Sequence, residues 1–250
     1  MNFEDILKKD VSKKEIILGH NGNRYLKVDI YENPSIIITG ETGTGKSILL
    51  DEILLQLFTK YTSLEMNLIA IDTSGVELNY YTQTRYSLIN ALNDKNKALV
   101  VLENVIKEIH HRKDILDKNN CNNAFEYNNK TNKKMPLLVV AIDDNDSLLD
   151  EPDIDNILKY IITNIKGLNI FLVLVTNDVH NKFFINDENT NASILISFDY
   201  ASETESNYAN LPNVEDLEIG KFKIKVNNKI YKFSNIEFDD NIIKRVLETK

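Results

Sequence analysis

The stretch that decides the fold of this chain is Ser35-Ile36-Ile37-Ile38-Thr39-Gly40-Glu41-Thr42-Gly43-Thr44-Gly45-Lys46-Ser47. Its first five residues are mostly apolar and β-branched, as in a short buried strand. Residues 40–47 then match the pattern G-x-x-x-x-G-K-[ST] at every defined position. After them, apolar residues recur at helical spacing, at Leu50, Ile53, Leu54, Leu57 and Phe58. A strand, a glycine-rich loop and a helix in this order predict a phosphate-binding loop.

Each residue type in this loop has a physical role in holding phosphate. The glycines let the backbone curl with its N–H groups pointing inward, and the positive end of the following helix adds to the attraction for an anion. We expect Lys46 to contact the β- and γ-phosphates of a nucleotide and the Ser47 hydroxyl to be a ligand of Mg²⁺. The predicted nucleotide-binding residues are Gly40, Glu41, Thr42, Gly43, Thr44, Gly45, Lys46, Ser47 and Ile48.

Length and composition limit the kinds of protein that this chain can be. Its 250 residues and 28.7 kDa suit one α/β domain with a substantial core. Apolar residues make up 42% and charged residues 27%, which is ordinary for a globular protein. The longest apolar runs are too short to cross a bilayer, and the charged first ten residues do not resemble a signal peptide. Because the single Cys121 cannot form an internal disulfide, we expect a cytoplasmic protein.

The balance of charge bears on the partners of the chain. A net charge of −9 argues against indiscriminate binding of nucleic acid, because such affinity comes mostly from Lys and Arg side chains on phosphates. Local basic surfaces are compatible with this charge. The candidates are Lys221, Lys223 and Lys225, or Lys130, Lys133 and Lys134.

Strand-like and helix-like patterns alternate along the chain. Apolar runs at 36–39, 68–71, 137–142, 170–175 and 194–198 suit strands that are buried on both faces of a parallel sheet. Helical patterns lie between them, which predicts an α/β fold with right-handed crossovers. After Gly220, apolar residues alternate with lysines up to a turn at Asn227-Asn228, and Asp239–Lys250 suits a short helix. We therefore predict one domain over 1–250, with an N-terminal β segment (1–34), a core (35–219) and a terminal hairpin and helix (220–250).

Asparagine is abundant throughout the chain and densest over the stretch Asp117–Lys134, which we interpret as a genome-wide compositional bias plus one flexible insertion. Cys121 lies within it and is expected in a solvated loop. His110 and His111 are adjacent, so they point to different faces of a helix and predict no metal site. Mg²⁺ is the one metal that we expect.

The apolar run 137–142 ends in two carboxylates, Asp143 and Asp144, as a Walker B strand does. Asp143 would hold the Mg²⁺ shell, and Asp144 lies where many P-loop ATPases have a Glu that polarises the attacking water. An acidic turn after a strand is the alternative. Asp is shorter than Glu by on the order of 1.5 Å, and a base misplaced by about 1 Å can cost roughly 100-fold in rate, so we expect slow hydrolysis.

A polar pair, Thr176-Asn177, follows the strand predicted at 170–175. Asn177 lies where a sensor of the γ-phosphate would be, and we include it with Lys46 and Asp144 among the candidate catalytic residues. Capping of a helix by Thr176 or Asn177 is the alternative.

Taken in order, these residues resemble the motor domain of the FtsK/SpoIIIE family over almost the whole chain. The family opens with a leucine-glycine pair and a turn, which is similar to Leu18-Gly19-His20-Asn21-Gly22, and its acidic strand leads into the phosphate loop. Its next strand has the form IDPKxxEL and is similar to Ile71-Asp72-Thr73-Ser74-Gly75-Val76-Glu77-Leu78. Further similar positions are Arg112, Asn123, Tyr127-Asn128, Thr176-Asn177-Asp178-Val179 and the segment 220–233.

The resemblance implies a RecA-like P-loop NTPase core, ATP with Mg²⁺, a ring of six copies and double-stranded DNA in its pore. It also implies an arginine that a neighbouring subunit supplies. Arg112 and Lys232 are the candidates here, with a solvated surface position as the alternative for each. Several cationic positions of the family are neutral or acidic in this chain, namely Ser74, Asn177-Asp178-Val179 and Glu203-Thr204-Glu205-Ser206-Asn207.

We therefore predict an ATP-binding and ATP-hydrolysing motor domain that resembles DNA translocases. One alternative is a weakly active module that recruits protein substrates in secretion or conjugation. The other is a subunit that uses ATP to stabilise an oligomer.

Overall fold

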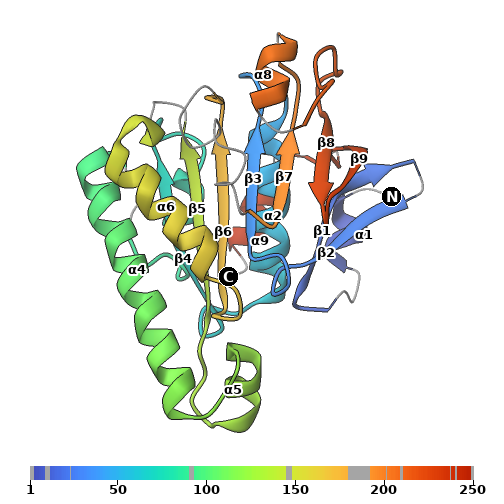
Figure 1. Cartoon of the computed structure of the whole chain (residues 1–250). Coiled ribbons are helices and arrows are strands. Elements are labelled where there is room, and N and C mark those ends of the chain that lie inside the picture. The colour runs from blue at the N-terminus through green and yellow to red at the C-terminus, as the bar shows by residue number, and fades with distance from the viewer. Residues whose placement is uncertain are drawn as a thin grey trace.

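The central feature of the fold is a mixed sheet of nine strands in the described part of the chain, in the order β2-β1-β9-β8-β7-β3-β6-β5-β4 (Figure 1). The computed structural model describes residues 3–8, 12–22, 24–89, 93–144, 148–179, 192–200, 202–208, 211–236, 238–239 and 241–248. The sheet is parallel on one side and antiparallel on the other, and helices cover both faces. The predicted α/β fold is confirmed.

The parallel part of the sheet contains the five strands that the sequence predicts. They are β3 (Ser35–Thr39), β4 (Met66–Asp72), β5 (Leu137–Asp144), β6 (Ile170–Thr176) and β7 (Ile194–Ser197). Residues of β3, β5 and β6 are buried at every position, which explains why their sequences lack a polar face. In the parallel register Thr176 lies beside both Thr39 and Asp144, so the carboxyl ends of the strands meet at one edge.

Helices sort the core into two layers. α2 (Lys46–Lys60) and α9 (Asn241–Glu248) cover one face, and α4 (Lys95–Lys118) and α6 (Pro152–Asn164) cover the other (Figure 1). Along β3, Ile36 and Ile38 pack toward α2, whereas Ile37 packs toward α4 and α6. Each fully buried side chain of this kind contributes about 1.5–3 kcal/mol. No helix of the described residues is both long enough and apolar enough to span a membrane.

The antiparallel part joins the two ends of the chain. β8 (Lys221–Val226) and β9 (Lys229–Ser234) form the predicted hairpin, and Asn227 and Asn228 have the positive φ angles that its turn needs. β9 lies beside β1 (Glu15–Asn21), which pairs with β2 (Arg24–Asp29). The short elements are α1 (Phe3–Lys8), α3 (Asn79–Thr82), η1 (Leu148–Asp150) and α8 (Glu203–Tyr208).

The asparagine-rich stretch is ordered, so its interpretation as a flexible insertion is wrong. It contains the end of α4 and a further helix, α5 (Ala124–Lys130). The Asn123 side chain accepts a hydrogen bond from the Glu126 N–H at 2.9 Å and caps α5, and Asn120 has a positive φ of 48°. Cys121 is 8% exposed and belongs to the core beneath α4, which corrects the expected solvated loop. Asparagine serves here as a cap and turn residue.

Candidate functional site

The phosphate-binding loop lies at the carboxyl edge of the sheet, between β3 and α2. Two of its glycines are required by close contacts. A Cβ atom on Gly40 would lie 2.7 Å from the Cβ of Phe198, and one on Gly45 would lie 2.9 Å from Asn235 Nδ2. Both residues also have positive φ, at 142° and 114°. Only glycine fits this path, so the loop keeps the curl that the sequence predicts.

Lys46 is the cation of this loop. It is 6% exposed, and burial lowers its pKa to about 8. Its Nζ donates to the carbonyl oxygen of Glu41 at 2.8 Å, which is the one hydrogen bond it makes among the described residues. Since an ammonium group has three donors, Lys46 has capacity for an anionic ligand.

The first turn of α2 is also open to an anion. Its N-cap residue is Gly45, which offers no side chain to the helix N–H groups, and no acidic residue lies in the turn. Ser47 follows Lys46 on this turn and is half-buried. An uncapped helix N-terminus beside a buried cation fits a phosphate group.

The C-terminal part of the chain braces the loop. The Gly220 N–H donates to the Thr44 carbonyl at 2.8 Å, and Asn235 Nδ2 donates to the Gly45 carbonyl at 2.8 Å. Glu52 of α2 is fully buried and accepts the N–H of Ile236 at 2.7 Å. Sequence reasoning missed Asn235 and Glu52 as contributors, because they become neighbours of the loop only through the order of the strands.

Asp143 is the last but one residue of β5 and is 1% exposed. Burial, followed by the nearby charges of Asp72 and Glu77, raises its pKa to about 7, and Lys46 opposes these effects. The strand register places Asp72, at the end of β4, directly beside Asp143. A buried carboxylate among other acids is a site where a cation would be favourable.

Ser47 and Asp143 therefore fit a magnesium ion that also binds nucleotide phosphates. Mg²⁺ keeps several waters and typically uses one or two protein oxygens together with phosphates. Within the ranges that the structure describes, no group of three or more His, Cys, Asp or Glu side chains could hold a metal by itself. The two predicted ligands thus suit a metal that arrives with its nucleotide.

Asp144 is engaged in the fold. One of its carboxylate oxygens accepts the N–H of Leu148 at 2.8 Å, and the other accepts the N–H of Leu149 at 3.2 Å. The residue is 1% exposed and caps the turn of η1. The sequence indicates the position of this carboxylate, but it does not indicate the two backbone N–H groups that donate to it.

Asn177 follows β6, which lies between the loop strand β3 and the acidic strand β5. It is half-buried at the carboxyl edge. Its neighbour Thr176 accepts the N–H of Asp178 at 3.1 Å through Oγ1. Thr176 thus stabilises a turn, and Asn177 lies on the edge where a phosphate sensor is expected.

The predicted role of Arg112 at a subunit boundary is wrong. Arg112 is 3% exposed, and its Nη1 donates to the carbonyls of Pro136, Leu168 and Asn169 at 2.8–3.0 Å. These residues precede β5 and β6, so Arg112 lies at the amino edge of the sheet, opposite to the loop. The other candidate, Lys232, is exposed on β9.

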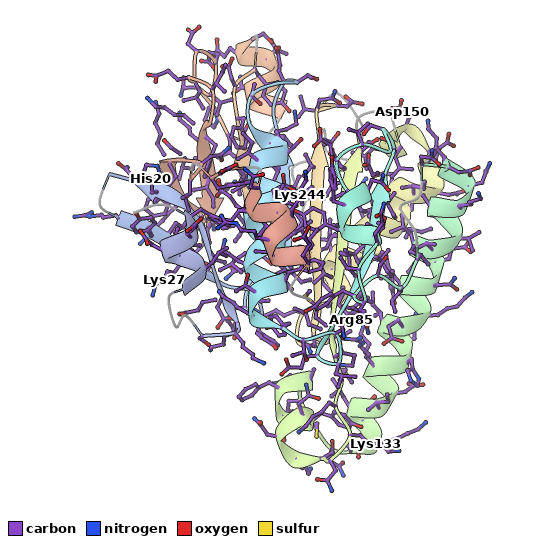
Figure 2. The ribbon with its side chains drawn as sticks, turned by 180° about the vertical axis from the view of Figure 1, so that it is seen from behind. His20, Lys27, Arg85, Lys133, Asp150 and Lys244 are labelled. Carbon is purple, nitrogen blue, oxygen red and sulfur yellow. The ribbon has the colours of Figure 1, made fainter. Side chains whose placement is uncertain are left out.

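The lysines expected to contact DNA belong to two separate regions. Lys223 lies directly across from Lys232 and donates to the carbonyl of Pro212 at 2.9 Å, while Lys221 pairs with Glu218 at 2.7 Å. Lys130 and Lys134 donate to backbone carbonyls near α5. In the view of Figure 2, the labelled Lys27, Arg85, Lys133 and Lys244 are likewise spread over separate parts of the molecule.

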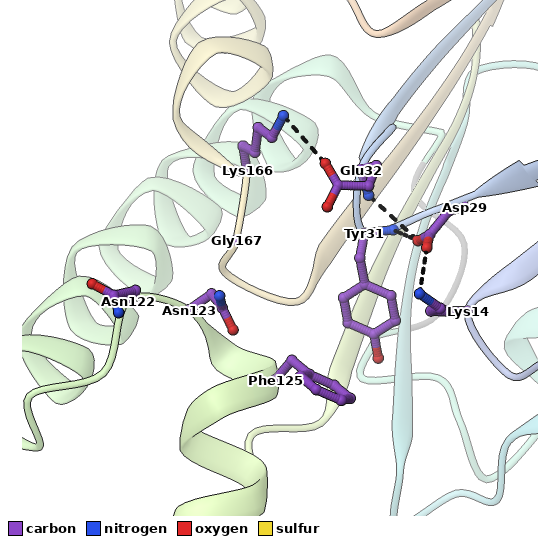
Figure 3. Close-up of a pocket in the computed structure, with 9 residues that line it drawn as sticks. All are labelled: Lys14, Asp29, Tyr31, Glu32, Asn122, Asn123, Phe125, Lys166 and Gly167. Carbon is purple, nitrogen blue, oxygen red and sulfur yellow. Dashed lines mark hydrogen bonds and ion pairs between the residues drawn. The ribbon is translucent and has the colours of Figure 1, made fainter.

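A cavity of about 380 Å³ lies away from the loop, between the end of β2 and the α4–α5 corner (Figure 3). Four charged side chains line it, and they pair with each other: Lys14 with Asp29 at 2.9 Å, and Lys166 with Glu32 at 3.6 Å. Its lining carries no excess of positive charge, so it does not suit the phosphates of a nucleotide. The glycine-rich loop is therefore the candidate nucleotide site.

Comparisons with known proteins show the family of the chain. The sequence model of the FtsK/SpoIIIE family matches residues 5–187. A DNA translocase FtsK of Leptospira interrogans serogroup Icterohaemorrhagiae serovar copenhageni is 26% identical over 210 residues, which are 80% of this chain and 22% of the relative. The chain thus spans about a fifth of the length of that translocase.

Two solved structures share the fold. The pCW3 conjugation coupling protein TcpA, a monomer form with ATPγS, has a TM-score of 0.79 at 22% identity, covering 98% of this chain and 72% of its own. The cytoplasmic domain of the type VII secretion ATPase EccC of Thermomonospora curvata has a TM-score of 0.77 at 18% identity, covering 99% of this chain and 34% of its own.

Proposed function

Since the chain belongs to the FtsK/SpoIIIE family, we propose that it is a cytoplasmic motor domain that binds ATP with Mg²⁺ and hydrolyses the ATP slowly. The observation that carries this proposal is Lys46, a buried cation in a glycine loop with capacity for further hydrogen bonds, beside the buried carboxylate of Asp143. The similarity to proteins described as a translocase and a secretion ATPase supports it.

Different residues of the site have different proposed roles. The backbone N–H groups of residues 40–48 and the Lys46 ammonium bind and orient the phosphates. Ser47 and Asp143 would hold Mg²⁺, which would supply positive charge against the charge that develops on the phosphates. Asn177 is proposed to orient the attacking water. The assignment of Asp144 as the group that polarises this water stays a prediction, and its two bonds to backbone amides set it apart from the other site residues.

We further propose that the chain works as a ring of six copies around double-stranded DNA. The basic hairpin and the α5 lysines supply few phosphate contacts, so one subunit would bind duplex only in the range of about 10⁻⁴ to 10⁻⁶ M. Several subunits on one duplex would raise the affinity through effective concentration. Binding is therefore expected only when the protein is assembled and loaded with nucleotide.

Recruitment of a protein substrate is the second candidate function. The net charge of −9 and the engagement of Lys221 and Lys223 with Glu218 and Pro212 favour it over tight contact with DNA. On this alternative the ATPase rate would respond to a partner polypeptide. Stabilisation of an oligomer by ATP is the third outcome that the experiment below distinguishes.

Phosphate release is the measurement that tests the proposal, with Mg²⁺ or EDTA and with or without duplex DNA. We expect slow release that requires Mg²⁺ and rises with DNA at low salt. ATP binding with no Mg²⁺-dependent release would reject hydrolysis. Sedimentation with a non-hydrolysable ATP analogue and DNA tests the ring: a monomer at high protein concentration would contradict it, and an ATP-dependent oligomer without turnover would favour the structural role.

A further inference from the structure

The loop after β4 brings a second acidic side chain to the edge of the sheet that holds the site. Asp72 ends β4, and one of its carboxylate oxygens accepts bonds from the Ser74 N–H, the Ser74 hydroxyl and the Gly75 N–H at 2.7–3.0 Å. The other oxygen accepts the Leu78 N–H at 2.9 Å. These bonds fold residues 73–78 back onto the end of the strand. Glu77 directly precedes Leu78, whose N–H makes the last of these bonds.

The same loop is fastened to the acidic strand. The Thr73 N–H and hydroxyl both donate to the Asp143 carbonyl, at 3.1 and 3.3 Å. Glu77 is half-buried. Its negative charge raises the pKa of Asp143, after the larger effects of burial and of Asp72. Glu77 therefore lies on a loop bonded to the proposed Mg²⁺ ligand, with a side chain one methylene longer than that of an Asp.

The contrast with Asp144 is one of availability. Both oxygens of Asp144 accept backbone N–H bonds within η1, and the residue is buried. To take a proton from water, Asp144 would have to break a bond that holds this turn. The bonds that fix the loop of Glu77 join backbone groups to the Asp72 carboxylate. None of these bonds has to break for the Glu77 carboxylate to accept a proton.

We propose that Glu77, and not Asp144, is the carboxylate that accepts the proton of the attacking water. The inference rests on the proposed hydrolysis of ATP. In the step, the water oxygen forms a bond to the γ-phosphorus, and the bond from the γ-phosphorus to the bridging oxygen of ADP breaks. The proton of the water passes to the Glu77 carboxylate, which later releases it to solvent. Asp144 serves as the cap of η1.

Paired variants test the proposal. Glu77→Gln should bind ATP and leave the bound ATP uncleaved in a single turnover, with a rate at least about 100-fold lower than that of the wild type. In EDTA it should bind ATP about 3-fold more tightly, because a negative charge near the phosphates is gone. Glu103→Gln makes the same change at an exposed position of α4 and should alter neither quantity. Asp144→Asn should lower the Tm by about 3 °C or more and cleave bound ATP within about 10-fold of the wild-type rate.

The outcomes distinguish a failure of the proposed hydrolysis from a failure of the role of Glu77. A wild-type chain that binds ATP and never cleaves it overturns the proposed hydrolysis and this inference with it. A wild-type chain that cleaves ATP while Glu77→Gln cleaves it equally fast overturns the role of Glu77 alone. Loss of cleavage in Asp144→Asn with an unchanged Tm would return the role to Asp144. Restoration of cleavage to Glu77→Ala by added formate would support the proton-acceptor role over a structural one.

Discussion

Lys46 and Arg112 are two buried cations at opposite edges of one sheet, and their hydrogen bonds differ. Lys46 is 6% exposed and donates to one carbonyl, whereas Arg112 is 3% exposed and donates to three carbonyls and to Glu108. Burial lowers the pKa of both groups. The acceptors of the Arg112 hydrogen bonds all belong to the chain itself, so Arg112 stabilises the fold. It leaves capacity on Lys46, so Lys46 is suited to bind a ligand.

The largest effect is expected from Arg112→Ala. This change removes the donor to three carbonyls that precede β5 and β6, and the bonds to two of them are buried. A buried acceptor that is left unsatisfied costs about 1–3 kcal/mol. We expect a loss of about 3 kcal/mol in the free energy of unfolding, measured by urea denaturation. ATP affinity per folded molecule should be unchanged. Lys107→Ala, at an exposed position of the same helix, is the control and should have little effect. Equal stability of the two variants would contradict the structural role.

Lys46→Ala should show the reverse pattern. The side chain supplies a charge-assisted contact in a loop otherwise made of backbone dipoles, so we expect ATP affinity to fall by about 100-fold or more. The Tm should not fall, because the variant removes a cation whose burial already lowers its pKa to about 8. Calorimetric titration with ATP and a thermal melt measure the two quantities. Unchanged ATP affinity would show that the phosphate-loop assignment is wrong.

The comparison also shows what the sequence can predict. The loop, the five parallel strands and the hairpin follow from local patterns: a complete phosphate-loop motif, β-branched runs and an asparagine turn. Local patterns do not give the hydrogen-bond partners of a group when those partners lie far away in the sequence or beyond a turn. Arg112 finds its carbonyls in two other segments, Asp144 finds its amides in η1, and the asparagines near Cys121 are caps that composition alone does not distinguish from a flexible loop.

The smallest effect concerns Asn235, which sequence reasoning could not connect with the loop. Its Nδ2 bonds the Gly45 carbonyl, 190 residues earlier in the chain, and holds the loop next to Lys46. One neutral hydrogen bond is worth about 1 kcal/mol, so Asn235→Ala should weaken ATP binding by about 5-fold. Asn21→Ala removes the same kind of bond, from Asn21 Nδ2 to the Lys232 carbonyl at 3.0 Å on the far side of β9, and is the control. If both variants bind ATP as the wild type does, the bond from Asn235 does not position the loop for its ligand.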